Sequence, residues 1–222
     1  MWKDRGLTPL EALNKLRELQ AIPTSTKLGF AGRLDPLAEG VMLALVGEEN
    51  KDRQKYFDLD KEYEFDVLFG FQTESHDIMG RLLPTNPKFK IQNPKVGKKI
   101  QEYPKHSSKR IAKNYAEVAP KEVEIYSFEK IKEYSKPANE VLIEIEQKLK
   151  QVNGNFGQAE FLKEWREVLT TLGFEALNFG FFRAHVSSGT YIRLLAHEMG
   201  GLAWRITRTR VGDYRKEACL AV

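Results

Sequence analysis

A carboxylate in a stiff loop is the first feature of this sequence that could do chemistry. Asp35 lies in the segment GRLDPLAEG, residues 32–40, where glycines flank an Asp-Pro pair. Such glycines mark a tight loop, and Pro36 restricts Asp35 to an extended or turn conformation. The apolar run from Val41 to Val46 predicts a buried strand directly after it. A carboxylate held before a buried strand is well placed to act as a nucleophile, although an ordinary Asp-Pro turn has the same spacing.

Arg193 is the second candidate, because its predicted position is unfavourable without a partner. Tyr191 to Met199 predicts a short helix, and if Thr190 caps it, Arg193 lies in the first turn. A cation there opposes the helix dipole by about 0.3–1 kcal/mol. A carboxylate from elsewhere in the chain would compensate. The alternative is an arginine that faces solvent.

Tyr63 is the third candidate. Apolar or aromatic side chains at positions 63, 65, 67 and 69 alternate with the acidic residues Glu62, Glu64 and Asp66, which predicts a half-buried strand with an aromatic face. A tyrosine in such a strand is either an ordinary core residue or a ring presented to an unstacked base.

Composition bounds the class of protein. The 222 residues are 41% hydrophobic and 30% charged, as in a soluble domain with its own core. The single cysteine, Cys219, excludes an internal disulfide and a thiolate zinc site. The N-terminus lacks an apolar signal region, and no run approaches the ~18 apolar residues of a spanning helix. We therefore expect a cytoplasmic protein that does not contact membranes.

The distribution of charge points to a polyanionic partner. Residues 87–121 hold ten Lys or Arg against two acids, a local charge of +8 in a chain whose net charge is +4. Residues 205–216 hold five further bases against Asp213. Such patches are typical of nucleic-acid binding, and a solvated lysine-rich loop would have the same composition.

The elements that must position these residues follow from the pattern. Thr8, Pro9 and Glu11 predict a capped helix start, followed by leucines at spacing three. Residues 84–121 are rich in Pro and Lys and predict mostly loop. Further strands are predicted at 123–128, 179–186 and 205–211, and helices at 139–151 and 158–172. This irregular order predicts an α+β domain.

Taken together, these segments resemble the TruB family of pseudouridine synthases. Residues 32–40 and the apolar run resemble the catalytic motif, and residues 189–193 match Gly-Thr-Tyr-Ile-Arg. The other matches, in chain order, are Lys3 with Gly6, Lys61-Glu62-Tyr63, Thr73 with Asp77 and Gly80, Gln101 to Lys109, and Arg208 with Val211 and Tyr214. Three positions depart from the pattern: Asp4 replaces a proline, Phe30 a histidine and His106 a tyrosine.

The resemblance implies a pseudouridine synthase fold, with a mixed, mostly antiparallel sheet flanked by helices and loops. It implies that Asp35 is the essential carboxylate, acting on the sugar, the base or the C2′ proton. Arg193 would pair with Asp35, and Tyr63 would stack on the target uracil. The remaining substrate-binding residues would be Tyr191, Ile206, Asp77, Arg208 and Lys61. Neither a cofactor nor a metal ion would be needed.

The expected substrate is tRNA, recognised through its T-arm by a monomer and isomerised at the T-loop uridine, position 55 in tRNA numbering. We expect residues 1–222 to form a single catalytic domain, with a basic loop-rich segment at about 84–121 and without a C-terminal PUA-type RNA-binding domain. One alternative is a synthase acting on ribosomal RNA, against which Pro36 and residues 189–193 speak. The other is a non-catalytic tRNA-binding or folding protein, which would not need Asp35, Tyr63 and Arg193 together.

Overall fold

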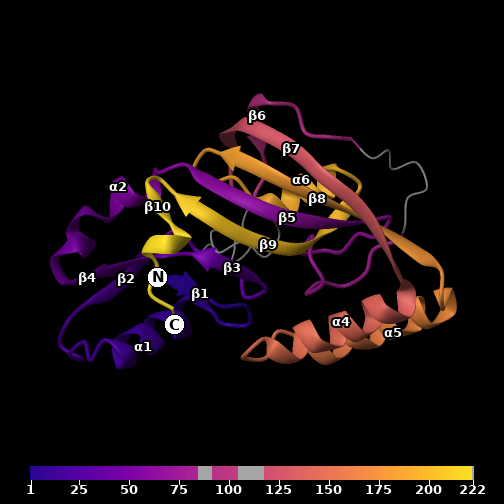
Figure 1. Cartoon of the computed structure of the whole chain (residues 1–222), viewed down its shortest axis with the longest axis horizontal. Helices are drawn as coiled ribbons and strands as arrows, with labels where there is room; N and C mark the ends of the chain where they lie inside the picture. The colour runs from indigo at the N-terminus through magenta and orange to yellow at the C-terminus, as the bar shows by residue number, and fades with distance from the viewer. Residues whose placement is uncertain (85–91, 105–117, 222) are drawn as a thin grey trace.

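An eight-stranded sheet forms the centre of the protein in this computed structural model, which describes residues 1–84, 92–104 and 118–221 (Figure 1). The strand order is β1-β3-β9-β5-β8-β7-β6, with β10 beside β9. The strands are β1 (Trp2–Lys3), β3 (Ala38–Val41), β5 (Lys61–Phe69), β6 (Gly97–Gln101), β7 (Lys121–Pro137), β8 (Ala176–Val186), β9 (Gly201–Val211) and β10 (Tyr214–Arg215).

Only one strand pair in this described sheet is parallel: β3 runs alongside β9, with Ala38 opposite Ile206 and Gly40 opposite Arg208. The other neighbours are antiparallel. A separate two-stranded ribbon joins β2 (Leu28–Ala31) to β4 (Leu43–Val46). The predicted α+β fold with a mixed, mostly antiparallel sheet is confirmed.

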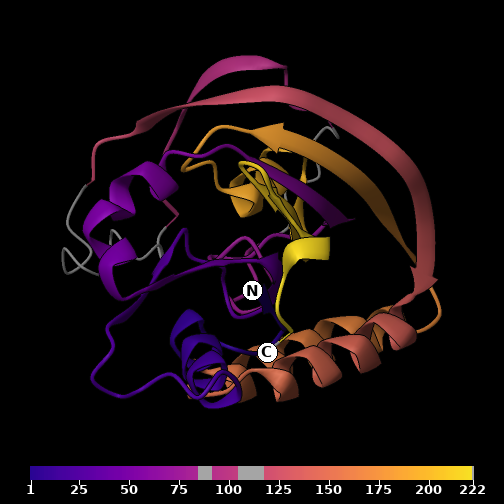
Figure 2. The same ribbon diagram turned by 60° about the vertical axis from the view of Figure 1, so that its left-hand side comes forward.

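The four longest of the described helices contribute to two cores. The described helices are α1 (Pro9–Leu19), α2 (Arg53–Phe57), α4 (Ala138–Gln151), α5 (Gln158–Leu172) and α6 (Ile192–Glu198), with short 3-10 helices at Gly47–Asp52 and Lys216–Ala218. Residues of α1 and α6 join one core with Tyr63, Phe65 and Ile206. Helices α4 and α5 lie side by side and join the other core with Leu202 and Trp204 (Figures 1 and 2). Because side chains alternate between the faces of a strand, these two cores lie on opposite faces of the sheet.

The start of α1 forms as its sequence predicts. The Thr8 side chain accepts a hydrogen bond from the Glu11 backbone N–H at 3.3 Å, and the Glu11 carboxylate accepts one from the Thr8 N–H at 2.7 Å. The capping box is therefore complete. In the portion of the chain that the structure describes, no helix has the length and hydropathy needed to cross a bilayer.

Four sequence predictions need correction. The run Val41 to Val46 is divided between two sheets, because β3 ends at Val41 and β4 begins at Leu43. Strand β7 extends to Pro137, well past the predicted end at residue 128, and β6 lies in the predicted loop. The N-cap of α6 is Tyr191, not Thr190, whose hydroxyl donates to the Ser187 carbonyl at 2.9 Å.

Candidate active site

Two buried cations fix the loop that carries Asp35 between β2 and β3. The Lys3 Nζ donates to the carbonyls of Ala38 at 2.6 Å and Pro36 at 3.4 Å. From the other side, the Arg208 guanidinium donates to the carbonyls of Gly32 at 2.9 Å, Arg33 at 3.2 Å and Val41 at 2.7 Å. Lys3 is fully buried and Arg208 nearly so. The loop is therefore anchored through its backbone, and the Asp35 carboxylate is not needed to hold it.

Gly40 allows β3 to approach β9 closely enough for this anchoring. Its φ is +125°, in the region that favours glycine, and a Cβ there would lie 2.2 Å from the Arg208 carbonyl oxygen. Since Arg208 is the residue whose side chain holds the loop, any larger residue at position 40 would push that anchor away.

Asp35 forms an ion pair with Arg193. The Arg193 Nε lies 2.8 Å from the Asp35 Oδ2, although the two residues are 158 positions apart. The Asp35 side chain is 42% exposed, whereas that of Arg193 is 6% exposed. Arg193 is the second residue of α6, so it lies in the first turn as predicted. The predicted compensation of its charge by Asp35 within about 4 Å is confirmed.

A second carboxylate holds Arg193 from behind. The Arg193 Nη1 lies 3.6 Å from the Asp77 Oδ2 and donates to the Ser75 carbonyl at 2.6 Å. Asp77 is itself fixed, since its Oδ1 accepts from the Ser75 hydroxyl at 2.6 Å and from the Met79 N–H at 2.8 Å. The guanidinium thus bridges a buried carboxylate and an exposed one.

The charges in this cluster depend on each other. Burial would lower the pKa of Arg193, but the attraction of Asp35 and then of Asp77 outweighs it, and the pKa is raised. Burial raises the pKa of Asp77, an effect that Arg193 opposes. Burial also lowers the pKa of Lys3 to about 8, against the attraction of Asp35. Removing Arg193 would leave Asp77 as an uncompensated buried carboxylate.

Tyr63 and Ile206 lie in the strands next to the Asp35 loop. Tyr63 on β5 is opposite Arg208 on β9, and Ile206 is opposite Ala38 on β3. Both side chains belong to the same core as Leu34, and each is 8% exposed. The sequence leaves open whether Tyr63 is a core residue or presents its ring to a base; in the structure the ring is largely buried beside the loop.

Lys61 completes the buried cations around the loop. Its Nζ donates to the carbonyls of Phe57, at 2.9 Å, and Leu59. Burial and repulsion from Arg208 lower the pKa of Lys61 to about 8. The family resemblance implies substrate contacts for Lys61, Arg208 and Asp77. In the structure all three side chains are buried and bound to the protein itself.

Gln101 holds the backbone of Tyr191 in place, a role that its sequence did not predict. Its Oε1 accepts from the Tyr191 N–H at 2.8 Å, and its Nε2 donates to the Tyr191 carbonyl at 3.2 Å. The Tyr103 ring meets Tyr191 edge to face at 5.7 Å. Gln101 is 2% exposed. The signal in the sequence was the segment Gln101 to Lys109, of which residues 105–109 lie outside the described residues.

The basic segment at 87–121 also lies partly outside the described residues, since the structure describes only residues 92–104 and 118–121 of it. Within the described ranges, no cluster of three or more His, Cys, Asp or Glu side chains could hold a metal ion.

The fold recurs in solved structures. A chain of the crystal structure of a Cbf5-Nop10-Gar1 complex superposes with a TM-score of 0.56 at 18% identity, covering 97% of this chain and 48% of that one. A chain from the structure of an H/ACA RNP bound to a substrate RNA containing 2'-deoxyuridine superposes with a TM-score of 0.55, also at 18% identity. The match covers 97% of this chain and 47% of that one. At this identity, the likeness establishes the architecture.

The family follows from sequence. The profile of TruB family pseudouridylate synthases (N terminal domain) matches residues 20–152, and this chain belongs to that family. It is 28% identical to tRNA pseudouridine synthase B of Aquifex aeolicus, covering 97% of this chain and 64% of the relative. It is also 28% identical to tRNA pseudouridine synthase B of Endomicrobium trichonymphae, covering 90% of this chain and 75% of the relative. The expected pseudouridine synthase fold is confirmed, in a chain that spans about two thirds of the Aquifex relative and half of the superposed chains.

Proposed function

We propose that this chain is a tRNA pseudouridine synthase that isomerises the T-loop uridine, position 55 in tRNA numbering, without a cofactor. The observation that carries the proposal is the Asp35–Arg193 ion pair, in which an exposed carboxylate is held by a buried guanidinium. Family membership and the names of the relatives support tRNA as the substrate class. The enzyme would act as a cytoplasmic monomer on the tRNA T-arm.

The proposed reaction moves one bond. The glycosidic bond from uracil N1 to ribose C1′ breaks, the base turns, and a bond from C5 to C1′ forms. The C5 proton is released and N1 gains one, so the atoms balance without a co-reactant. The target uridine must leave its stack before Asp35 can reach it.

Arg193 would orient the Asp35 carboxylate through one edge of its guanidinium while its other edge stays bound to Ser75 and Asp77. Tyr63, Tyr191 and Ile206 would line the site, with the Tyr63 ring against the uracil. Because their side chains bind backbone carbonyls, we assign Lys61 and Arg208 to holding the site together.

Basic residues at the end of β9 and beyond would bind the RNA backbone. Of the five bases in residues 205–216, Arg215 and Lys216 are exposed and accessible for such contacts. Phosphate contacts of this kind position an RNA without reading its sequence. Together with the basic segment at 87–121, they would hold the T-arm while the loop enters the site.

Tritium release from transcripts that carry C5-labelled uridine tests the proposal. We expect stoichiometric release of one tritium per tRNA, and none from a tRNA transcript with cytidine at position 55 or from Asp35→Asn. Equal release from the cytidine transcript would refute the assigned position. Release from ribosomal RNA alone would support that alternative target, and tight tRNA binding without release would support a non-catalytic protein.

A further inference from the structure

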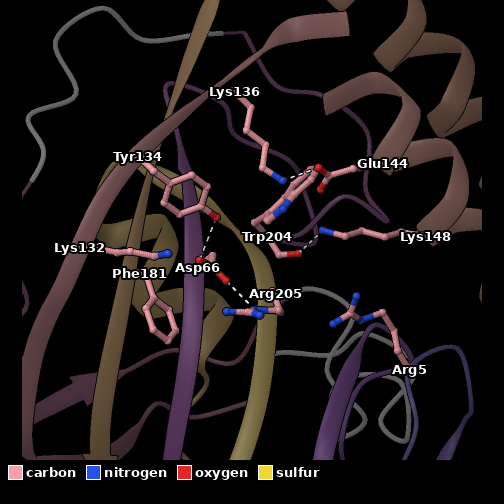
Figure 3. A pocket seen from close by; sticks show the side chains of 10 residues that line it. All are labelled: Arg5, Asp66, Lys132, Tyr134, Lys136, Glu144, Lys148, Phe181, Trp204 and Arg205. Atoms are coloured by element: carbon pink, nitrogen blue, oxygen red, sulfur yellow. Dashed lines mark hydrogen bonds and ion pairs between the residues drawn. The ribbon is translucent and has the colours of Figure 1, made fainter. Parts of the chain in front are cut away.

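A hollow of about 560 Å³ opens between the sheet and α4 (Figure 3). It lies on the face opposite to the Asp35 site. Asp66, three residues after Tyr63 on β5, and Arg205, directly before Ile206 on β9, both line the hollow. An odd spacing along a strand places two side chains on opposite faces of the sheet. The register between β5 and β9 shifts here, since Asp66 is opposite Arg205 and Val67 is opposite Ala203. This irregularity lets the adjacent Trp204 and Arg205 both line the hollow.

Positive charge is in excess around the hollow. Five cations line it against two carboxylates, a net charge of +3 when all are ionised: Arg5, Lys132, Lys136, Lys148 and Arg205 against Asp66 and Glu144. Both carboxylates are already engaged. Asp66 pairs with Arg205 at 2.6 Å and accepts from the Tyr134 hydroxyl at 2.9 Å, and Glu144 pairs with Lys136. Arg5 pairs with Glu39 at 3.1 Å, outside the lining, whereas Lys132 and Lys148 form no ion pair among the described residues. These two amines therefore offer the donors and charge that an anion would complete.

Lys148 is the cation that gains most from such an anion. Its side chain is 8% exposed, and its Nζ donates to the Trp204 carbonyl at 2.8 Å. Burial, followed by repulsion from Arg5, lowers the pKa of Lys148 well below its ordinary value. The charged form of Lys148 is thus poorly compensated, and a bound anion would stabilise it.

Cations already lie over the aromatic rings of the hollow. The Lys148 Nζ lies 3.3 Å from the centroid of the Trp204 ring, Arg205 lies over Phe181 at 5.3 Å, and Lys132 over Tyr134 at 5.4 Å. One face of Tyr134 also stacks on Phe179 at 5.1 Å. These rings hold the cations in place and are not presented to a nucleobase. The ligand is thereby restricted to an anionic group without a stacking requirement.

We propose that this hollow is a phosphate-binding pocket, separate from the Asp35 site. A phosphate group brings up to two negative charges and several acceptor oxygens, which suits two arginines and three lysines better than a single carboxylate does. The phosphate would belong either to an RNA backbone crossing this face or to a small phosphorylated molecule.

Titration with inorganic phosphate at constant ionic strength, followed by calorimetry, tests the pocket without RNA. We expect saturable binding that Lys132→Gln weakens by about fivefold, because a partly exposed cation of this kind contributes modestly. Lys130→Gln is the matched control, since Lys130 lies on the same strand, is paired with Glu133 at 2.9 Å and does not line the hollow. Absence of saturable binding, or equal weakening by both variants, would overturn the proposal.

Proton uptake gives a second, independent readout. If phosphate binds beside Lys148, binding in buffers of different ionisation enthalpy should show proton uptake at a pH just above the lowered pKa, and Lys148→Met should abolish it. Unchanged uptake in a folded Lys148→Met protein would contradict the assigned position of the phosphate.

A T-arm hairpin RNA distinguishes the two sources of phosphate. If the pocket binds the RNA backbone, phosphate should compete with the hairpin, and Lys132→Gln should weaken hairpin binding while Lys130→Gln does not. If it binds a small phosphorylated molecule, hairpin affinity should be the same with and without phosphate. Either result keeps the pocket, and neither depends on turnover at Asp35, so failure of the proposed function would be seen separately.

Discussion

Replacing Arg193 by lysine separates the charge of this side chain from its shape. In the structure two different nitrogens of the guanidinium serve two sides: Nε lies 2.8 Å from Asp35, and Nη1 lies 2.6 Å from the Ser75 carbonyl. A lysine has one nitrogen on a shorter head group and can serve one of these sides. Because the Ser75 and Asp77 side is the buried one, we expect the lysine to remain there and Asp35 to lose its partner.

The size of the effect follows from the contact that is lost. A contact involving a charged group contributes about 1.5–3 kcal/mol, and each 1.36 kcal/mol changes a rate tenfold. We therefore expect Arg193→Lys to lower turnover about 10- to 100-fold. The affinity for tRNA should change by less than about threefold, since the charge is kept and the group is too deep to reach RNA phosphates.

Single-turnover tritium release with enzyme in excess measures the chemical step, and filter binding measures affinity. Arg183→Lys is the matched control, because Arg183 pairs with Glu64 at 2.9 Å and is 52% exposed. Urea unfolding of each variant shows whether the site is still folded. Turnover of Arg193→Lys within about threefold of wild type, or an equal loss in Arg183→Lys, would refute the assigned role of the guanidinium.

Three further predictions concern the carboxylate, the RNA interface and a buried amine. Asp35→Asn should abolish tritium release and leave tRNA affinity within a few-fold; comparable turnover would end the catalytic assignment. The affinity for tRNA should fall steeply with salt, by about 0.7–0.9 log units per tenfold of salt for each phosphate contact, and a flat slope would remove the basic segments from the interface. Burial lowers the pKa of Lys3 from 10.5 to about 8, so between these values the unfolded chain holds more protons at this site and the free energy of unfolding should rise with pH. Lys3→Met should reduce that rise by about 2–3 kcal/mol in urea titrations, and identical pH slopes in the two proteins would contradict this.

Local patterns predicted those elements whose causes are local. The capping box of α1 depends on residues three apart, and α4 and α5 depend on apolar spacing within one helix, so their sequences suffice. Strand β7 shows where such patterns fail. Beyond Phe128 it carries exposed charged side chains such as Glu129, Lys130 and Glu133. No apolar period marks it, and only pairing with β8 extends it to Pro137.

In the candidate site, too, some contacts could be predicted from the sequence and others could not. An arginine at a helix start requires a carboxylate, so the need for a partner was visible at Arg193 itself, and the family motif supplied Asp35. The backbone contacts of Lys3, Arg208 and Gln101 were not predictable, because a carbonyl acceptor leaves no mark in the residue types. Met42 is a related case: its N–H donates to the Met1 carbonyl at 2.9 Å, where the chain passes from one sheet to the other. Nothing in an apolar run indicates that change of partner.

Anchoring the Asp35 loop through carbonyls meets two demands, and anchors made of carboxylates could not meet both. The loop must be rigid, and Lys3 and Arg208 provide this by donating to three carbonyl oxygens of the loop and to two of β3. Under the proposed function, the site must also receive a phosphodiester chain. Carboxylate partners would hold the same cations, but they would repel both Asp35 and the incoming RNA and would compete for Arg193. Carbonyl oxygens carry no net charge, so the loop is fixed while the positive charges beneath it remain available to attract the backbone of the substrate.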